Sequence, residues 1–307
     1  MTMAEHPSWP SLPFEQWQDT CATLHMWTQI VGKIRLEREP MVNHWWQVPL
    51  YVTSTGLTTS PMPYPSCSFQ IDFDLCRHVL VVTTTDARRT EFALGPYSVA
   101  DFYRKIMGAL HELGIEVAIW TMPVEVVDAI PFEQDHEHKS YDADAAHRFW
   151  RVLVQGDRVM KQFRAGFLGK VSPVHFFWGS FDLAVTRFSG RTAPPHPGGM
   201  PQLGDWVARE AYSHEVSSAG FWPGNGGFGK AAFYSYAYPA PPGFADAPLR
   251  PPAARFDNKL QEFILEYEAV RTADNPDQML LDFFQSTYDA AANAGHWDRA
   301  ALERQPT

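Results

Sequence analysis

Histidines, arginines and carboxylates alternate with aromatic residues between positions 172 and 223 of this 307-residue chain. The string SPVHFFWGSFDLAVTRFSGR carries His175 and Asp182, and the string REAYSHEV carries His214. A histidine that is oriented by a carboxylate can move protons as a general acid or base. We therefore expect His175 or His214 to be the acid–base group of an enzyme, with Asp182 as the orienting carboxylate.

The pair Gly179-Ser180 lies between two apolar runs and predicts a two-residue hairpin turn. In that register Phe177 is opposite Asp182, and His175 lies diagonal to Asp182 on the same face of the hairpin. Side chains can bridge such a diagonal. The functional interpretation is a catalytic pair, and the structural interpretation is a buried ion pair or a solvated sheet face.

A second strand is expected over 211–217, where apolar and polar residues alternate. Together with this segment, the hairpin offers a set of candidate ligands for a divalent metal, namely His175, His214 and a carboxylate, Asp182 or Glu210. Such a metal would support hydrolysis or lyase chemistry. The chain has neither the HExxH spacing nor a Cys/His cluster, so hydrogen-bonded core histidines are the alternative.

Four further residues are expected to contact a substrate. Arg187 and Arg191 flank a Phe-Ser-Gly turn and could clamp a carboxylate or a phosphate, although two surface salt bridges are the alternative. Phe177 and Tyr212 lie on the faces that carry the candidate histidines, and we expect their rings to contact the substrate.

Three other motifs do not support a site. The string DHEH (135–138) lies in an acidic loop and is expected to be solvated. The string GNGGFGK (224–230) lacks the spacing of a phosphate-binding loop. Ser180 does not lie in a GxSxG elbow, so a serine hydrolase is not expected.

The composition restricts the class of protein. Hydrophobic residues make up 45% of the chain and charged residues 20%, which is typical of a globular protein. The net charge of −10, without a run of Lys or Arg, argues against nucleic-acid binding. Neither a secretory signal nor an apolar run of membrane-spanning length is recognised, and the three cysteines form no CxxC pair. We expect a cytoplasmic protein without a membrane partner.

The elements that must position these residues follow from periodicity and from capping signals. Ser98 is expected to cap a helix, with Asp101 as its capping-box partner, and Asp142 and Asp274 are expected to begin two others. The predicted helices cover 14–30, 98–113, 142–168 and 276–293. Strands besides the hairpin and 211–217 are predicted at 34–36, 44–54, 68–73, 79–84, 90–94, 115–120, 232–238 and 262–267.

These elements predict an α+β fold with mainly antiparallel sheets and packed helices. We expect an N-terminal lobe (1–120), an acidic Pro-containing interlobe loop (121–141) and a C-terminal lobe with the candidate site (142–307). Both halves run helix, strands, helix, and VTSTGLTTSPMP in the first half resembles VTRFSGRTAPPHP in the second. One interpretation is an ancient duplication that produced two similar lobes. The other is that Pro-rich loops often follow aromatic strands.

Four strings carry a resemblance to a family of uncharacterised bacterial proteins, a domain of unknown function: WPSLPFEQWQDTCATLHMWTQIVGKIRL, WTMPVEV, SPVHFFWGSFDLAVTRFSGR and EAYSHEVSSAGFWPG. The resemblance spans nearly the whole chain and implies a soluble bacterial protein of one architecture, without implying catalytic residues. The residues themselves favour an enzyme that acts on a small polar or aromatic molecule. The alternatives are a non-catalytic small-molecule binding protein with an aromatic-lined pocket and a structural or interaction protein. The oligomeric state stays open.

Overall fold

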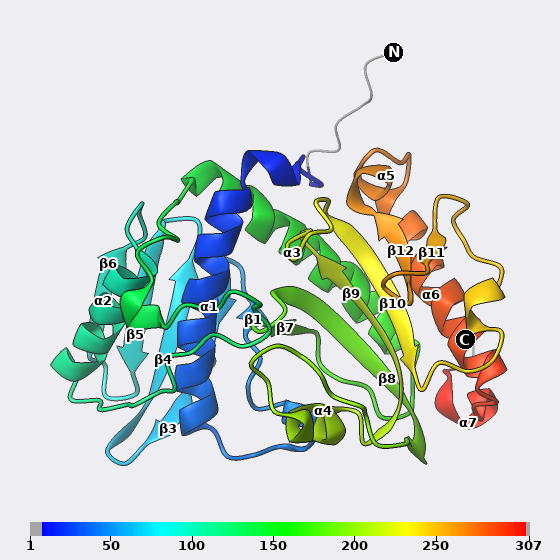
Figure 1. The fold of residues 1–307 in the computed structure, drawn as a ribbon, viewed down its shortest axis with the longest axis horizontal. Coiled ribbons are helices and arrows are strands. Elements are labelled where there is room, and N and C mark those ends of the chain that lie inside the picture. The colour runs from blue at the N-terminus through cyan, green and yellow to red at the C-terminus, as the bar shows by residue number, and fades with distance from the viewer. Residues whose placement is uncertain (1–7, 305–307) are drawn as a thin grey trace.

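Two antiparallel sheets and the helices packed on them form the chain, whose computed structural model describes residues 8–304 (Figure 1). The α+β prediction is confirmed. The first sheet contains β1 (Tyr51–Val52), β2 (Gly56–Thr58), β3 (Met62–Tyr64), β4 (Cys67–Asp74), β5 (Val79–Thr84) and β6 (Arg89–Ala93). The second contains β7 (His175–Phe177), β8 (Asp182–Thr192), β9 (His214–Trp222), β10 (Ala232–Tyr238), β11 (Arg255–Asp257) and β12 (Glu262–Glu266).

The two sheets meet at one backbone bridge. Leu50, just before β1, exchanges two hydrogen bonds of 2.9 Å with Phe176 of β7. From this bridge the first sheet runs β1-β2-β4-β5-β6, with β3 beside β4, and the second runs β7-β8-β9-β10-β12-β11. Both sheets therefore meander outwards from a shared centre. This arrangement agrees with the duplication, which itself stays a prediction.

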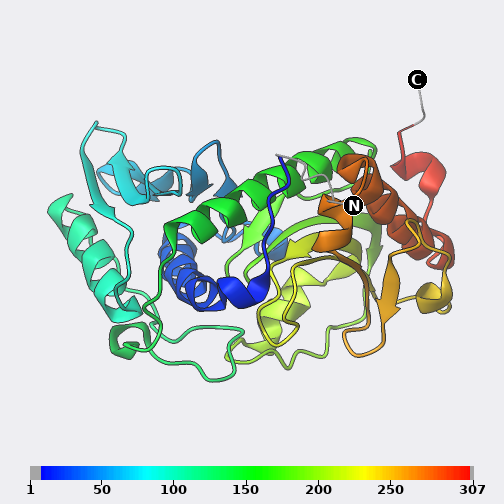
Figure 2. The same ribbon diagram turned by 90° about the horizontal axis from the view of Figure 1, so that it is seen from above.

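Helices cover the sheets and join them (Figures 1 and 2). They are α1 (Gln18–Arg38), α2 (Val99–Glu112), α3 (Ala143–Ala165), α4 (Asp205–Ala211), α5 (Tyr267–Arg271), α6 (Pro276–Ala294) and α7 (Arg299–Leu302). The long helix α3 contacts β1 in one sheet, β8 and β9 in the other, and α6. One cluster of buried hydrophobic side chains extends through both halves. The division of the chain at 121–141 stays a prediction.

Local signals placed several elements correctly. Ser98 accepts a hydrogen bond from the Asp101 backbone and caps α2, and Asp142 caps α3 through Ala145. The strands predicted at 68–73, 79–84, 90–94, 232–238 and 262–267 correspond to β4, β5, β6, β10 and β12. The hairpin register of Phe177 opposite Asp182 is confirmed. The turn is longer than predicted, because the ladder ends at that pair and Phe181, at φ 61°, closes a four-residue loop.

Other elements were predicted wrongly. Residues 34–36 belong to α1, residues 115–120 form no strand, and only Tyr51–Val52 of the predicted strand 44–54 is a strand. Residues 211–217 are not one strand either, because α4 continues to Ala211 and β9 begins only at His214. The cap of α6 is Asn275 instead of Asp274. In each case tertiary packing or a neighbouring side chain overrode a short local pattern.

Within residues 8–304, no helix is both long and apolar enough to cross a membrane.

Candidate functional site

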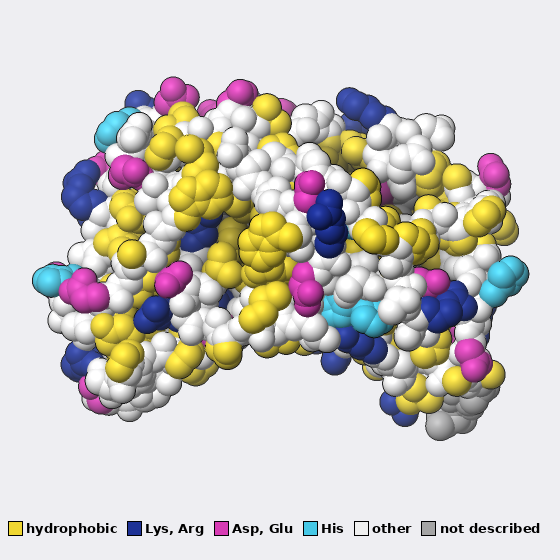
Figure 3. All heavy atoms as spheres, turned by 60° about the horizontal axis from the view of Figure 1, so that its bottom comes forward, with side chains coloured by type: hydrophobic (Ala, Val, Ile, Leu, Met, Phe, Trp, Pro, Cys, Tyr) yellow, Lys and Arg dark blue, Asp and Glu magenta, His cyan; other side chains and the backbone are white. Residues whose placement is uncertain are grey.

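A cavity of about 400 Å³ lies where α1, the β7–β8 hairpin, α4 and the inner strands of the second sheet come together. The space-filling view shows hydrophobic side chains around a hollow on the face that carries α4 (Figure 3). Five tryptophans line the cavity: Trp45, Trp46, Trp120, Trp178 and Trp206. Trp120 and Trp206 are 60% and 64% exposed, so they lie at its rim, while Trp178 is buried.

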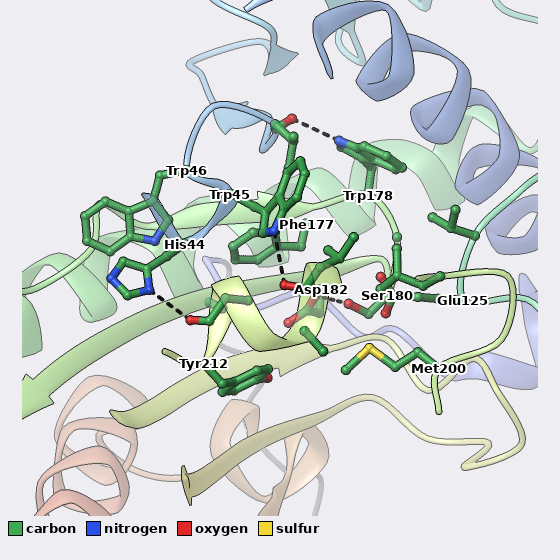
Figure 4. Close-up of a pocket in the computed structure, with 18 of the residues that line it drawn as sticks. His44, Trp45, Trp46, Glu125, Phe177, Trp178, Ser180, Asp182, Met200 and Tyr212 are labelled. Carbon is green, nitrogen blue, oxygen red and sulfur yellow. Dashed lines mark hydrogen bonds between the residues drawn. The ribbon is translucent and has the colours of Figure 1, made fainter. Parts of the chain in front are cut away.

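The tryptophans are held in place through their backbone and their N–H groups. The Trp178 indole donates a 2.9 Å hydrogen bond to the Val48 carbonyl, and the Trp45 indole donates one of 3.1 Å to Val207 of α4 (Figure 4). Trp178 also packs directly on α1, since a Cβ at Gly32 would come within 2.2 Å of its indole ring. Gly32 therefore allows the indole to approach the helix closely enough to form this wall.

Asp182 is the central polar residue of the site. Its carboxylate is 7% exposed and accepts hydrogen bonds from the Ser180 hydroxyl, at 2.9 Å, and from the Tyr234 hydroxyl. Burial raises the pKa of Asp182 to about 6, although both hydrogen bonds act in the opposite direction. A buried carboxylate without a cation is costly, so at neutral pH this group favours a positive partner.

Glu125 places a second carboxyl beside Asp182, at the same end of the cavity (Figure 4). Its backbone is in the left-handed region, at φ 59°, and its N–H donates a 2.8 Å hydrogen bond to Pro201. A Cβ at Gly179 would lie 2.1 Å from the Glu125 Oε1 atom, so the glycine makes room for the carboxyl. Burial, followed by the negative charge of Asp182, raises the pKa of Glu125 to about 7.

A second cavity, of about 460 Å³, lies on the other side of Asp182. Both cavities are lined by Ser180, Asp182, Tyr212, Tyr234 and Tyr236. Glu262 lines only the second one, and burial, together with the charge of Asp182, raises its pKa to about 7. Tyr212 and Tyr236 share a 2.7 Å hydrogen bond between their hydroxyls. Burial raises the pKa of Tyr212 to about 12, so this phenol stays neutral.

Three carboxyl groups with raised pKa values thus surround the place where the two cavities meet. Among residues 8–304, no Lys, Arg or His side chain forms an ion pair with Asp182, Glu125 or Glu262. Buried charges in proteins are usually paired. The site therefore has an excess of acid and walls of aromatic rings, which together suit an organic cation.

Three of the residues predicted from the sequence line this cavity, and five do not. Asp182, Phe177 and Tyr212 are in its wall. His175 lies on the same sheet face as Phe177 and Asp182. Its side chain is 1% exposed and is enclosed by Trp46, Tyr51 and Phe177. Neither of its ring nitrogens has a hydrogen-bond partner within residues 8–304, and burial, followed by Arg35 and Arg164, lowers its pKa to about 3.

His214 lies apart from this group. Its ring Nδ1 is 3.1 Å from the Ser213 hydroxyl, and its ring meets His44 edge-on at 5.6 Å between centroids. Neither His214 nor Glu210 lines either cavity, so the structure does not bring His175, Asp182 and His214 together. In the part of the chain that the structure describes, no three His, Cys, Asp or Glu side chains are grouped closely enough to hold a metal ion. The predicted metal ligands are therefore not assembled.

The two arginines predicted as an anion clamp lie away from the cavity as well. Arg187 is on the opposite face of β8, in the core, with its guanidinium 3.5 Å from the centroid of the Phe163 ring. Arg191 is at the surface, where it pairs with Glu215 at 2.6 Å and donates to the carbonyl of His296. This ion pair is the surface salt bridge that the sequence offered as the alternative.

Other lining residues were missed from the sequence, namely Lys33, Glu125, Ser180, Tyr234, Tyr236 and Glu262. The first two reach the site from α1 and from the loop after α2, which are distant in sequence from the hairpin. Alternation over β10 could have placed Tyr234 and Tyr236 on one face. No local pattern marked Lys33 or Glu125.

A family model matches residues 9–304 of the chain, which is nearly its full length. The chain belongs to DUF5996, a family of unknown function. The DUF5996 match includes both sheets and every residue that lines the two cavities. No curated protein and no solved structure matches the chain.

Proposed function

We propose that this member of DUF5996 binds a small organic cation, with its apolar body between the tryptophans and its charged nitrogen beside Asp182 and Glu125. The observation that carries the proposal is a set of three carboxyls without an ion-pair partner among residues 8–304: the buried Asp182, the half-buried Glu125 beside it in the aromatic-lined cavity, and the half-buried Glu262 in the adjoining one. A cavity of about 400 Å³ has the size of a typical small-molecule site.

The aromatic rings and the carboxyl groups of the cavity have complementary roles. Aromatic faces attract a cation through the ring quadrupole, by about 0.5–2 kcal/mol for each good contact. The Asp182 carboxylate supplies a charge-assisted acceptor, and the Ser180 and Tyr234 hydroxyls that donate to it hold it in place. A neutral molecule of the same shape would gain only the apolar contact, so the site should discriminate by charge.

Titration with 2-phenylethylamine, followed by tryptophan fluorescence and calorimetry, tests the proposal directly. The matched neutral probe is 2-phenylethanol, which keeps the ring and lacks the ammonium. We expect the amine to bind at least about tenfold more tightly, because truncating one partner of a buried, hydrogen-bonded charge pair costs about 2–5 kcal/mol. Equal affinities of the two probes would contradict the proposal.

The carboxyl variants locate the cation. Asp182→Asn and Glu125→Gln should each weaken amine binding and leave binding of the alcohol nearly unchanged. The matched control is Asp128→Asn, which removes an exposed carboxylate from the same loop as Glu125. If Asp128→Asn weakened binding as much as Asp182→Asn did, the effect would come from net charge and the assigned site would be wrong.

A second candidate is catalysis at the same carboxyls. It is favoured by the pKa values of about 6 for Asp182 and about 7 for Glu125, which suit proton transfer near neutral pH. His175 is enclosed, so acid–base work in this cavity would fall to these two groups. Turnover of an amine that is lost in both Asp182→Asn and Glu125→Gln would support this candidate, whereas stable binding without any change of the ligand would support the binding protein.

A further inference from the structure

Lys33 differs from every other lysine of the chain. All seven lysines lie in residues 8–304, and Lys33 alone is buried, with 4% of its surface exposed. It lies on α1 and lines the cavity of about 400 Å³. The other six are exposed and include Lys161 and Lys230, which pair with carboxylates. The position of Lys33 therefore needs an explanation beyond solubility.

The amine of Lys33 has an aromatic neighbour and, among the described residues, neither a hydrogen-bond nor an ion-pair partner. Its Nζ atom is 4.5 Å from the centroid of the Trp120 ring. Within residues 8–304, no carboxylate forms an ion pair with it and no acceptor takes a hydrogen bond from it. Trp178 packs against Gly32, the preceding residue of α1, so Lys33 lies next to the part of the cavity wall that Trp178 forms.

Burial without an ion-pair or hydrogen-bond partner among the described residues favours the uncharged amine, against the attraction of the Trp120 ring for the ammonium. Burial lowers the pKa of Lys33 to about 8, so a substantial fraction of the amine is neutral at physiological pH. A neutral lysine amine in an apolar pocket is a nucleophile towards carbonyl carbons. A lysine in water, with a pKa near 10.4, is almost entirely protonated under the same conditions.

We propose that Lys33 forms a reversible imine with an aldehyde or ketone that enters this cavity. The lone pair of Nζ attacks the carbonyl carbon and gives a carbinolamine. The carbonyl oxygen then leaves as water, taking both hydrogens of the amine, and a C=N bond forms between Nζ and the former carbonyl carbon. No oxidant or reductant is needed. The inference rests on the place of Lys33 in the lining of the cavity and is independent of cation binding at Asp182.

Reductive trapping tests the imine. The native protein is incubated at pH 7 with benzaldehyde and sodium cyanoborohydride, which reduces the imine to a stable secondary amine, and the labelled lysines are found by peptide mass spectrometry. We expect Lys33 to be labelled at least about tenfold faster than the exposed lysines other than Lys170, because a buried amine is neutral far more often than one in water. Lys170 is left out of the comparison because burial lowers its pKa as well. The labelling rate of Lys33 should rise with an apparent pKa of about 8.

The five exposed lysines other than Lys170 act as internal controls in the unmodified protein, so the main result does not depend on the folding of a variant. Lys33→Arg keeps a cation over Trp120 but cannot form an imine, and the fast labelling should disappear. Labelling of exposed lysines without Lys33, or fast labelling that persists in Lys33→Arg, would overturn the proposal. The first outcome would indicate that Lys33 is a stacked ammonium.

The two proposals can fail separately. A fast label at Lys33 in a protein that binds 2-phenylethylamine and 2-phenylethanol equally would remove only cation binding at Asp182. Loss of the label in the native protein with normal amine binding would remove only the imine.

Discussion

Strand β8 carries two buried charged residues that face opposite sides of the sheet, Asp182 and Arg187. Arg187 is 1% exposed and is surrounded by the rings of Phe163, Phe167 and Tyr288, while its guanidinium donates to the Phe163 carbonyl. Asp182 is 7% exposed and faces a cavity in which, among the described residues, no cation forms an ion pair with it. Burial lowers the pKa of Arg187 to about 10, and its Nε atom has no hydrogen-bond partner among residues 8–304. The difference is in the surroundings, because Arg187 is packed among rings and a carbonyl, whereas Asp182 borders open space.

This difference separates a structural charge from a functional one. A buried charge that is packed closely among other side chains contributes to the fold, and its removal leaves a hole and an unpaired acceptor. A buried charge with two hydroxyl donors and open space beside it costs stability, and a ligand of opposite charge can recover that cost. Burial alone therefore does not distinguish the two, whereas the nature of the neighbours does.

The largest expected effect is a loss of stability when the buried Arg187 is replaced. Arg187→Ala removes a buried side chain from among three aromatic rings and leaves a hole in the core. We expect the free energy of unfolding to fall by about 3–5 kcal/mol, as for large-to-small core substitutions and broken buried charge contacts. Urea denaturation measures it. The matched control is Arg191→Ala, which removes a surface salt bridge and should lower the free energy of unfolding by less than about 1 kcal/mol. Equal losses in the two variants would show that Arg187 is no more important for stability than a surface arginine.

Asp182→Asn should act in the opposite direction on stability. Its folded pKa of about 6 lies above the ordinary value of 3.8, so protonation favours the folded state. The stabilisation of the folded state by protonated Asp182 is complete below pH 4 and is lost as the pH rises to about 6. We expect the variant to be about 1–3 kcal/mol more stable than the native protein at pH 7 and equal to it near pH 4. Urea denaturation at both pH values checks this, and a destabilised variant at pH 7 would show that Asp182 has a stabilising partner.

The pH dependence of amine binding tests whether ionised Asp182 and Glu125 pair with the ammonium. Asp182 and Glu125 must lose protons before they can pair with an ammonium, and their pKa values are about 6 and about 7. We expect the affinity for 2-phenylethylamine to rise about tenfold between pH 5 and pH 7 and then to level, with proton release on binding below pH 7. Calorimetry in buffers of different ionisation enthalpy detects the released protons. An affinity that falls over this range would exclude a carboxylate–ammonium contact.

The smallest expected effect tests the position of Glu125. In Gly179→Ala the new Cβ would lie 2.1 Å from the Glu125 Oε1 atom, so the flexible carboxyl must move. We expect about a threefold to tenfold loss of amine affinity, with less than about 1 kcal/mol change in stability. The control is Gly108→Ala on α2, where the new Cβ has nothing within 4 Å; it should leave affinity unchanged and should stabilise the helix slightly. An unchanged affinity for 2-phenylethylamine in Gly179→Ala would show that Glu125 does not contribute to the binding of the amine.

Much of the fold followed from local patterns. The caps at Ser98 and Asp142 depend on residues three positions apart, and such contacts are specified by the sequence around them. The register that places Phe177 opposite Asp182 follows from strand parity. The strands predicted at 34–36 and 115–120 failed because short apolar runs fit helices, loops and strands equally well.

The sequence by itself determined which face of the hairpin carries His175, Phe177 and Asp182, because side chains alternate strictly along a strand. Only the tertiary structure decided what covers that face. Trp46 and Tyr51 enclose His175, whereas Asp182, seven positions later, faces a cavity. Glu125 and Lys33 reach this cavity from distant segments, and such encounters depend on how the helices and loops pack, which no local spacing encodes.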